Sequence, residues 1–297
     1  MKTYFLYIEV SGNDRKTGEK EMIQDIAPKK YDNHYREQLP ETKDWLLIYQ
    51  NGDALCRFEE EKICFPRVDE IDQEEKEMTY LFSISGERFF LLKNELKKKP
   101  DGYTWEKPPV FRNAKPQYRG FAGITGQQLD GWYRANRFCG CCGTPMIPDH
   151  EERMVRCEKC GNLIYPKICP GVIVAVTDGN RLLLTKYANR PGVVNYALVA
   201  GFTEVGETLE ETVQREVMEE VGLRVKNIRY YKSQPWSFSS TLLCGFVCDV
   251  DGSTDITLDR SELALAEWFE REDIPLEDDG VSLTREMIDQ FKKGRIR

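Results

Sequence analysis

Short apolar runs recur along the first third of the chain, separated by charged and turn-forming residues. They predict strands at residues 3–10 and 45–50. They also predict a hairpin whose strands, residues 80–85 and 88–92, are joined by a Gly-Glu turn. The first 94 residues are therefore expected to form a small α+β unit.

The pattern changes further along the chain. Residues 95–116 are rich in lysine and proline and are expected to form a loop or linker, followed by a helix over residues 125–136. An Asp-Gly-Asn turn predicts a hairpin of residues 171–177 and 181–186. Further strands are expected at residues 196–200, 228–232 and 241–250, and a closing amphipathic helix at residues 282–293. Strands mixed with helices on either side predict an α/β fold, an α/β/α sandwich around a mixed sheet.

One predicted helix has clear signals at both ends. Thr208 followed by Glu211 is a capping-box pattern, so the helix is expected to begin there, and Gly222 suits the left-handed position just past its end. At about 100° per residue, one apolar stripe runs along the helix. Its members are Leu209, Val213, Val217 and Val221.

Three glutamates of this helix lie in or beside the apolar stripe. Glu220 falls inside it, Glu216 on its edge and Glu219 just beyond, so a spacing of i, i+3 and i+4 lets the three carboxylates converge. Solvated glutamates are the ordinary alternative, but they would lie opposite the stripe. Burying neighbouring carboxylates is costly unless a cation neutralises them, and oxygen ligands select hard ions such as Mg²⁺ or Mn²⁺.

The residues around these glutamates extend the pattern. The segment 201–223 reads GFTEVGETLEETVQREVMEEVGL, with fixed spacings between Gly201, Glu207, Arg215-Glu216, Glu219-Glu220 and Gly222. It resembles the Nudix box of hydrolases that cut a nucleoside diphosphate linked to another group. The resemblance implies divalent ions that screen the phosphates and activate a water, with Glu207 and Arg215 supporting the metal site. Spacing alone leaves open which glutamate accepts the proton from water.

A second metal pattern precedes the box. Two CxxC knuckles, separated by fourteen residues, have the spacing of a structural zinc ribbon with four thiolate ligands. The four cysteines are Cys139, Cys142, Cys157 and Cys160. Cys141 could compete for a ligand position, although the two-residue spacing favours Cys139 and Cys142. His150 is expected at the surface. Because a closed four-thiolate site leaves no open position, its expected contribution is to folding.

Residues 233–238 read SQPWSF, which resembles the SQPW-x-F signature of the NADH pyrophosphatase family. Serines at positions 237 and 239 replace prolines that are common there, so the expected loop is less rigid. Together with the zinc ribbon, this resemblance implies hydrolysis of NAD(H) to AMP and nicotinamide mononucleotide. Removal of an NAD cap from RNA 5′ ends breaks the same bond and stays open as a related activity.

The resemblance also implies roles in the pocket. Phe202 would stack on the nicotinamide ring, and Tyr165 would offer a second aromatic face near the same base. Gln234 and Trp236 would shape the pocket.

The family resemblance assigns three more residues and one assembly state. Glu262, in the segment SELALAEW, resembles a carboxylate outside the box that reaches the metal site, while Ser282 and Thr284 would line the nucleotide pocket. Threonine at position 284 departs from the small alanine that is usual there. Relatives of this kind suggest a homodimer.

Length and composition bound these interpretations. The 297 residues allow an N-terminal α+β domain with its linker (1–116), a helix plus zinc ribbon (117–167) and a Nudix domain (168–297). A net charge of −8 argues against a protein that coats nucleic acid. The sequence shows neither a signal-peptide pattern nor a run as long as a membrane span, so a cytoplasmic location is expected.

Two alternatives remain open. A pyrophosphatase acting on ADP-ribose or on another dinucleotide would use the same box, although SQPWSF argues against it. A non-catalytic Nudix sensor or zinc-ribbon adaptor would bind nucleotide without cleaving it, but such modules often lose the box glutamates, which are all present here.

Overall fold

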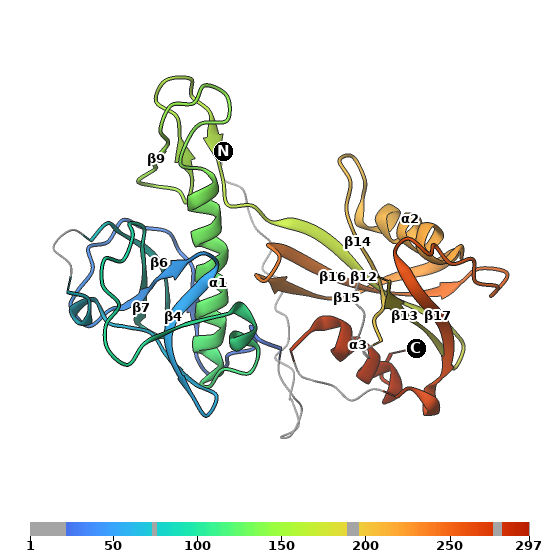
Figure 1. Cartoon of the computed structure of the whole chain (residues 1–297). Helices are drawn as coiled ribbons and strands as arrows, with labels where there is room; N and C mark the ends of the chain where they lie inside the picture. Colours follow the sequence, from blue (N-terminus) through green and yellow to red (C-terminus); the bar gives the residue numbers. More distant parts are fainter. Residues whose placement is uncertain (1–21, 73–75, 189–195, 276–280, 297) are drawn as a thin grey trace.

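A computed structural model describes residues 22–72, 76–188, 196–275 and 281–296 of the chain. Figure 1 shows two lobes, with the zinc-ribbon segment extending from the end of helix α1 (Gln117–Ala135). The strand expected at residues 3–10 lies outside the described residues. None of the described helices is long and apolar enough to cross a membrane.

The N-terminal lobe contains two small sheets. In the first the strand order is β1-β6-β7-β2: β1 is Tyr31–Asp32, β6 Met78–Ile84, β7 Glu87–Leu92 and β2 Trp45–Leu47. The second pairs β3 (Tyr49–Gln50), β4 (Asp53–Glu59), β5 (Lys62–Cys64) and β8 (Thr104–Glu106). The expected hairpin β6–β7 is confirmed. Its turn is Ser85-Gly86, one residue earlier than predicted. Both residues have positive φ, which a two-residue hairpin turn of type I′ requires.

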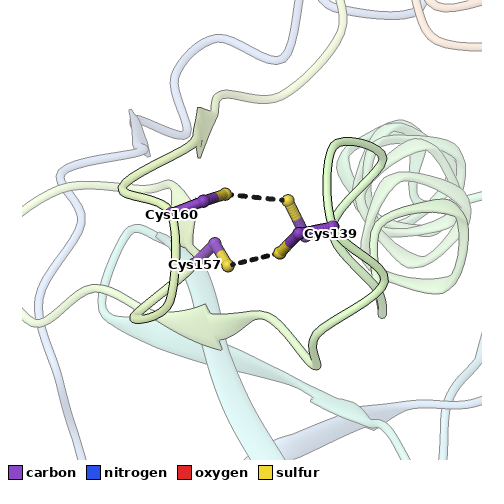
Figure 2. A group of neighbouring side chains, drawn as sticks. Cys139, Cys157 and Cys160 are labelled. Atoms are coloured by element: carbon purple, nitrogen blue, oxygen red, sulfur yellow. Dashed lines mark hydrogen bonds between the residues drawn. The ribbon is translucent and has the colours of Figure 1, made fainter.

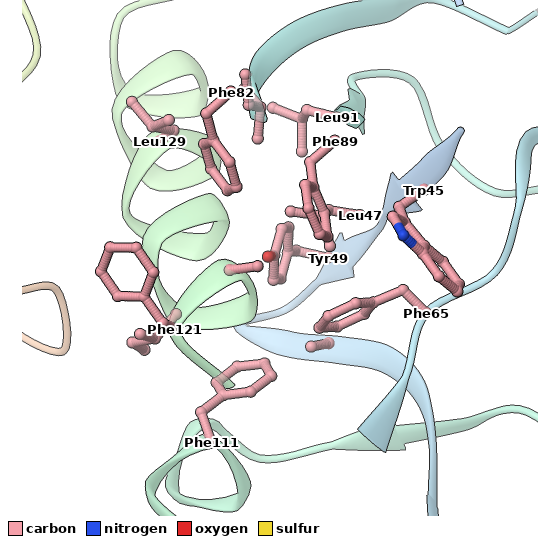
Figure 3. Close-up of a cluster of buried hydrophobic side chains, with 14 of the residues drawn as sticks. Trp45, Leu47, Tyr49, Phe65, Phe82, Phe89, Leu91, Phe111, Phe121 and Leu129 are labelled. Carbon is pink, nitrogen blue, oxygen red and sulfur yellow. The ribbon is translucent and has the colours of Figure 1, made fainter. Parts of the chain in front are cut away.

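Helix α1 closes the core of the N-terminal lobe. Its Phe121 and Leu129 pack with the aromatic side chains of the sheets, as Figure 3 shows. The helix begins eight residues before the predicted start at residue 125, in a stretch whose glycines weaken the sequence signal. Close packing compensates: a Cβ on Gly123 would lie 2.3 Å from the Phe111 ring.

The prediction of a loop or linker over residues 95–116 is correct only in part, because much of the segment is irregular but it packs as part of the N-terminal lobe. This segment forms β8 and the 3-10 helix η2 (Pro108–Arg112), and it buries Tyr103 and Phe111 in the N-terminal lobe. A second 3-10 turn, η1, covers Val68–Glu70. The charged and proline-rich composition of the segment concealed these two buried aromatic rings.

The C-terminal lobe is built on a six-stranded mixed sheet. The order is β15-β16-β12-β13-β17, and a short sixth strand, β14, also pairs with β12. Strands β12 and β16 are parallel and the other pairs are antiparallel. The bounds are β12 Cys169–Asp178, β13 Arg181–Tyr187, β14 Val199–Phe202, β15 Val225–Trp236, β16 Thr241–Val250 and β17 Leu263–Glu270.

One helix covers each face of this sheet. Along β12, Val174 and Val176 pack in the cluster that includes α2 (Leu209–Val221), while Ile173 packs in the cluster of α3 (Leu283–Lys292). This alternation follows from the two-residue period of a strand. The predicted α/β/α sandwich with a mixed sheet is therefore confirmed. A 3-10 turn, η3 (Arg271–Asp273), links β17 to the α3 side.

Several strand bounds differ from the predictions. Strand β15 continues through SQPW, so this signature is the end of a strand rather than a loop. Strand β14 begins at Val199, three residues later than expected, and β17 has no counterpart among the predicted strands. The hairpin β12–β13 and strand β16 match their predictions.

The two lobes are in contact. Met22, from the N-terminal segment, is buried with the residues around α3, and Phe238 of the C-terminal lobe packs against the N-terminal core. Gln117 Nε2 donates to the Met22 carbonyl at 2.6 Å. The proposed domain boundary at residue 116 therefore falls just ahead of a helix that packs with the first domain, and the division into three domains stays a proposal.

Candidate active site and zinc centre

Helix α2 has the caps that its sequence predicts. The Thr208 backbone N–H donates to Glu211 Oε2 at 2.8 Å, and the Glu211 N–H donates to Thr208 Oγ1 at 3.2 Å. Gly222 ends the helix with a φ of 71°. The stripe residues Val213 and Val217 are fully buried under the sheet. These contacts fix the helix, so its polar edge lies beside strand β14.

Arg215 links the glutamates along this edge. Its guanidinium donates twice to Glu207, from Nε to Oε1 at 2.5 Å and from Nη2 to Oε2 at 2.9 Å. Its Nη1 donates to Glu216 at 2.6 Å and to Glu219 at 3.1 Å. Hydrogen bonds from Arg215, first of all, then from the Glu204 N–H and from Thr212, lower the pKa of Glu207 to about 2. Glu207 is therefore an ionised anchor that orients Arg215.

Gly201 explains where the Glu216 carboxylate lies. A Cβ built on Gly201 would fall 1.9 Å from Glu216 Cδ, so the carboxylate occupies the space that any other residue would need. Burial, more than the other influences, raises the pKa of Glu216. The absence of a side chain at position 201 thus brings a carboxylate against the backbone of strand β14.

Substituting alanine for Gly201 tests this contact. We expect Gly201→Ala to displace the Glu216 carboxylate and to lower the catalytic rate by about tenfold or more, because small misplacements in a site are costly. Catalytic rates and thermal unfolding would be measured together. Gly131→Ala is the matched control, since a Cβ there meets open space. Unchanged activity in Gly201→Ala would contradict the proposed place of Glu216 in the site.

Glu220 is the most deeply buried of these carboxylates, with 2% of its surface exposed. The Ala200 N–H donates to its carboxylate, yet its Oε2 is buried without a hydrogen-bond partner among the described residues. Burial, followed by the charges of Glu216 and Glu262, raises its pKa to about 8. A buried acceptor among carboxylates fits a bound cation, and an all-oxygen set fits Mg²⁺ or Mn²⁺.

Glu219 and Glu262 lie at the solvent side of this group. The Glu219 side chain is 59% exposed, and Glu262 is an exposed residue just before β17, held by a hydrogen bond from the Ala188 N–H to its carbonyl at 2.9 Å. The negative charge of Glu262 nevertheless raises the pKa of both Glu216 and Glu220. The four glutamates therefore form one electrostatic group, and their role as metal ligands stays a prediction.

This acidic group is looser than the cysteine cluster. Among the residues that the structure describes, only the four cysteines bring three or more ligand atoms within 4.8 Å of one another. The expected convergence of the helix carboxylates on a single point is incomplete, because the Arg215 guanidinium holds Glu216 and Glu219.

The cysteine cluster has the geometry of a closed zinc site. Figure 2 shows thiols from the two knuckles facing one another: Cys139 Sγ lies 3.5 Å from Cys160 Sγ, and Cys142 Sγ lies 3.5 Å from Cys157 Sγ. Cys141 is exposed outside the cluster. Four thiols at these distances fit a structural Zn²⁺ ion.

The surroundings of Cys139 favour its thiolate form. The Cys141 N–H donates to Cys139 Sγ at 3.4 Å and is the main cause that lowers the pKa of Cys139 to about 6.

Strands β9 (Ile147–Pro148), β10 (Val155–Arg156) and β11 (Leu163–Ile164) form the ribbon sheet. His150 is outside the cluster and pairs with Glu37, which agrees with the predicted surface position.

A cavity of about 620 Å³ opens beside strand β14. Phe202, Trp236, Ser282 and Thr284, four of the residues assigned to the nucleotide pocket, line it together. Gly201 belongs to the same wall, so the cavity adjoins the Glu216 carboxylate. Phe202 keeps 55% of its surface exposed, which leaves a ring face available for stacking.

Gln234 lies behind the cavity wall. It is fully buried: its Nε2 donates to the Val281 carbonyl at 2.9 Å, and its Oε1 accepts from the Leu283 N–H at 2.7 Å. It therefore shapes the pocket indirectly, by fixing the start of α3.

Tyr165 is not brought to the Phe202 cavity. It is 52% exposed, its hydroxyl donates to Glu152, and it is absent from the described lining residues. In contrast, Arg112 and Arg285 do line the cavity, although no motif singles them out. Their places depend on tertiary packing, which no local sequence pattern indicates.

Comparisons with known proteins agree with this geometry. Residues 167–291 match the family described as NUDIX domain, and residues 134–165 match the NADH pyrophosphatase zinc ribbon domain. Two curated relatives are called NAD-capped RNA hydrolase NudC, one from Salmonella schwarzengrund (strain CVM19633) and one from Enterobacter sp. (strain 638). Each is 44% identical over 165 residues, which cover 55% of this chain and 63% of the relative.

The matched region thus spans less than two thirds of the length of these relatives. Among solved structures, a NUDIX hydrolase from Nitrosomonas europaea is 25% identical, with a TM-score of 0.46, and the match covers 54% of this chain and 92% of that one. The capped helix α2, the mixed sheet and the four-cysteine ribbon are the structural counterparts of the two matched domains. The chain therefore contains a Nudix domain at residues 167–291, preceded by a zinc ribbon of the NADH pyrophosphatase type at residues 134–165.

Proposed function

We propose that this protein hydrolyses the pyrophosphate bond of NAD(H) to AMP and nicotinamide mononucleotide. The main supporting observation is that Gly201 both lines the aromatic cavity and abuts the Glu216 carboxylate. A dinucleotide with a base in the cavity would therefore present its phosphates to the carboxylates of α2. The naming of relatives as NAD-capped RNA hydrolases supports the same choice of substrate.

Four carboxylates of this chain would hold the catalytic metal, Mg²⁺ or Mn²⁺: Glu216, Glu219, Glu220 and Glu262. When bound, a divalent ion would screen the phosphates and lower the pKa of a coordinated water. Arg215 and Glu207 would position the carboxylates through their paired hydrogen bonds. The Zn²⁺ ion of the ribbon would have a structural role only.

The cavity residues would orient the substrate. We assign Phe202 to stacking on the nicotinamide ring, because a flat aromatic needs only the π-face of its partner. Trp236 would form part of the cavity wall, and Ser282 and Thr284 would offer hydroxyl groups near the nucleotide. For Tyr165 we retain only the proposal of a role near the base, since in this structure it bonds within the ribbon.

Product analysis tests this function. Zinc-loaded protein would be incubated with NADH and Mg²⁺ or Mn²⁺, and the products separated by chromatography. We expect AMP and reduced nicotinamide mononucleotide in equal amounts. ADP-ribose would serve as the competing substrate, and its faster hydrolysis would favour the alternative pyrophosphatase. A lack of AMP with every metal would contradict the proposal.

Removal of NAD caps from RNA is a second candidate, favoured by the names of the relatives. The same bond would be cut, releasing nicotinamide mononucleotide and leaving an RNA with a 5′ monophosphate. Rates with free NADH and with NAD-capped RNA would be compared at one ionic strength, since contacts to RNA phosphates depend on salt. Following the family resemblance, we also propose a cytoplasmic homodimer, which sedimentation velocity and fractionation would test.

A further inference from the structure

Arg112 belongs to the N-terminal lobe but lines the cavity of the Nudix domain. It is the last residue of η2, whose neighbouring Phe111 is buried in the N-terminal core. Arg112 itself is exposed. The anchored 3-10 turn therefore extends a cation from one lobe into the cavity of the other.

Two aromatic rings of the SQPWSF segment hold this cation. The Arg112 Cζ lies 5.0 Å from the centroid of Trp236 and 5.0 Å from that of Phe238, and the two rings lie 4.8 Å apart. These distances are within the range of cation–π attraction. A guanidinium resting on ring faces keeps N–H donors along its edge, which can bind an anion.

The same segment is part of the contact between the lobes. Phe238 packs against the N-terminal core, and Gln234 Nε2 donates to Gln24 Oε1 at 3.0 Å. Trp236 meanwhile forms part of the cavity wall. The segment thus joins the two lobes and places Arg112 at the cavity through one set of contacts.

The charge of the cavity wall suits an anionic ligand. Among the described lining residues there are two arginines, Arg112 and Arg285, and no aspartate or glutamate. The acidic group of α2 lies beyond Gly201. The exposed Arg112 cation and the acidic group of α2 therefore border the same cavity, an arrangement that would bind phosphates between the Arg112 donors and metal-holding carboxylates.

We propose that Arg112 binds a phosphate group of the dinucleotide substrate, which makes the N-terminal lobe part of the substrate site. The inference rests on the proposed function for the identity of the ligand. Phosphates are the anionic groups of NAD(H) and of capped RNA, and guanidinium donors match phosphate oxygens in geometry. The phosphate is either in the pyrophosphate or in the first phosphodiester of a capped RNA.

Binding in the absence of catalysis gives the direct test. NADH would be titrated into zinc-loaded protein without Mg²⁺ or Mn²⁺, using wild type, Arg112→Ala and Arg112→Lys. Loss of a charge-assisted hydrogen bond should weaken binding by about tenfold in Arg112→Ala, with partial recovery in Arg112→Lys. With metal present, KM should rise while kcat changes little. An unchanged Kd and KM in Arg112→Ala would overturn the inference.

Lys107→Ala is the matched control. It removes a positive charge at the other end of η2, where Lys107 pairs with Asp53 outside the cavity lining, so substrate binding should not change. Thermal unfolding would check each variant. If Arg112→Ala unfolds, Arg112→Gln keeps part of the aliphatic stem and a polar end without the charge, and should show weakened binding as well.

Capped RNA identifies which phosphate is bound. A larger loss of affinity for NAD-capped RNA than for NADH would assign Arg112 to the phosphodiester, and equal losses would assign it to the pyrophosphate. The two proposals can fail separately. NADH hydrolysis with an unchanged Kd in Arg112→Ala would remove only the inference, whereas Arg112-dependent binding without hydrolysis would remove only the enzymatic proposal.

Discussion

Replacing Glu220 by glutamine is expected to lower the rate of NADH hydrolysis by about a hundredfold or more at saturating Mg²⁺ or Mn²⁺. The substitution keeps the size of the side chain but removes a negative charge from the centre of the acidic group. Glu220 is the buried member of that group, and its Oε2 has no hydrogen-bond partner among the described residues. Steady-state rates and product ratios would be measured for both proteins.

Glu210→Gln is the control for this substitution. Glu210 is an exposed glutamate in the first turn of the same helix, away from the acidic edge, and its replacement should leave the rate within about twofold. A Glu220→Gln enzyme that works as fast as this control would contradict the metal-binding role of Glu220.

Although Glu220→Gln should lower the catalytic rate, it should make the metal-free protein more stable than wild type as the pH rises. Burial and neighbouring charges raise the pKa of Glu220 to about 8 in the folded state, above its ordinary value of 4.5. The folded protein therefore binds the proton more tightly than the unfolded chain does, so wild type loses stability as the pH rises from about 4.5 towards 8. The variant should lack this loss, which thermal unfolding at several pH values would show.

Replacing Cys157 by serine is expected to abolish zinc binding and to lower the thermal midpoint by about 5 °C or more. Cys157 is buried, and its thiol lies 3.5 Å from that of Cys142. Without it, three thiolates would remain for an ion that takes four ligands in structural sites. Zinc content by elemental analysis and thermal unfolding would be compared with wild type.

Cys141→Ser is the matched control, because the Cys141 thiol lies outside the cluster while its backbone N–H donates to Cys139. This variant should keep one zinc per chain. Zinc retained at the wild-type level in Cys157→Ser, or lost equally in Cys141→Ser, would mean that the ligand set is wrong.

Local sequence signals predicted the elements whose ends are capped or turned. The capping box that begins at Thr208 predicted the start of helix α2, and Gly222 predicted its end. Gly179 predicted the turn of the hairpin β12–β13. Helix α1 was predicted too short because the glycines near its start are poor helix formers, and packing against Phe111 outweighs that cost. The fold of residues 95–116 depends on two buried rings that a lysine- and proline-rich composition hides.

The candidate site likewise combines residues that local sequence patterns predict with residues that only the packing of the fold brings in. The four cysteines form one cluster, as their spacing predicts, and the box glutamates lie along one edge of α2 without converging on a single point. Arg112 reaches the cavity only because its lobe docks on Trp236 and Phe238, an arrangement that no short motif encodes. Tyr165 was assigned by resemblance, and in this chain its hydroxyl bonds to Glu152 instead.

Calorimetric titration of Mn²⁺ into the zinc-loaded protein tests the central claim most directly. A pH of about 8 suits the measurement, because protons then compete less for a carboxyl with a raised pKa. We predict saturable binding in wild type and in Glu210→Gln, and binding weakened beyond detection in Glu220→Gln. Equal titration curves for wild type and Glu220→Gln would contradict the account, because the acidic edge of helix α2 would then not be the site of the catalytic ion.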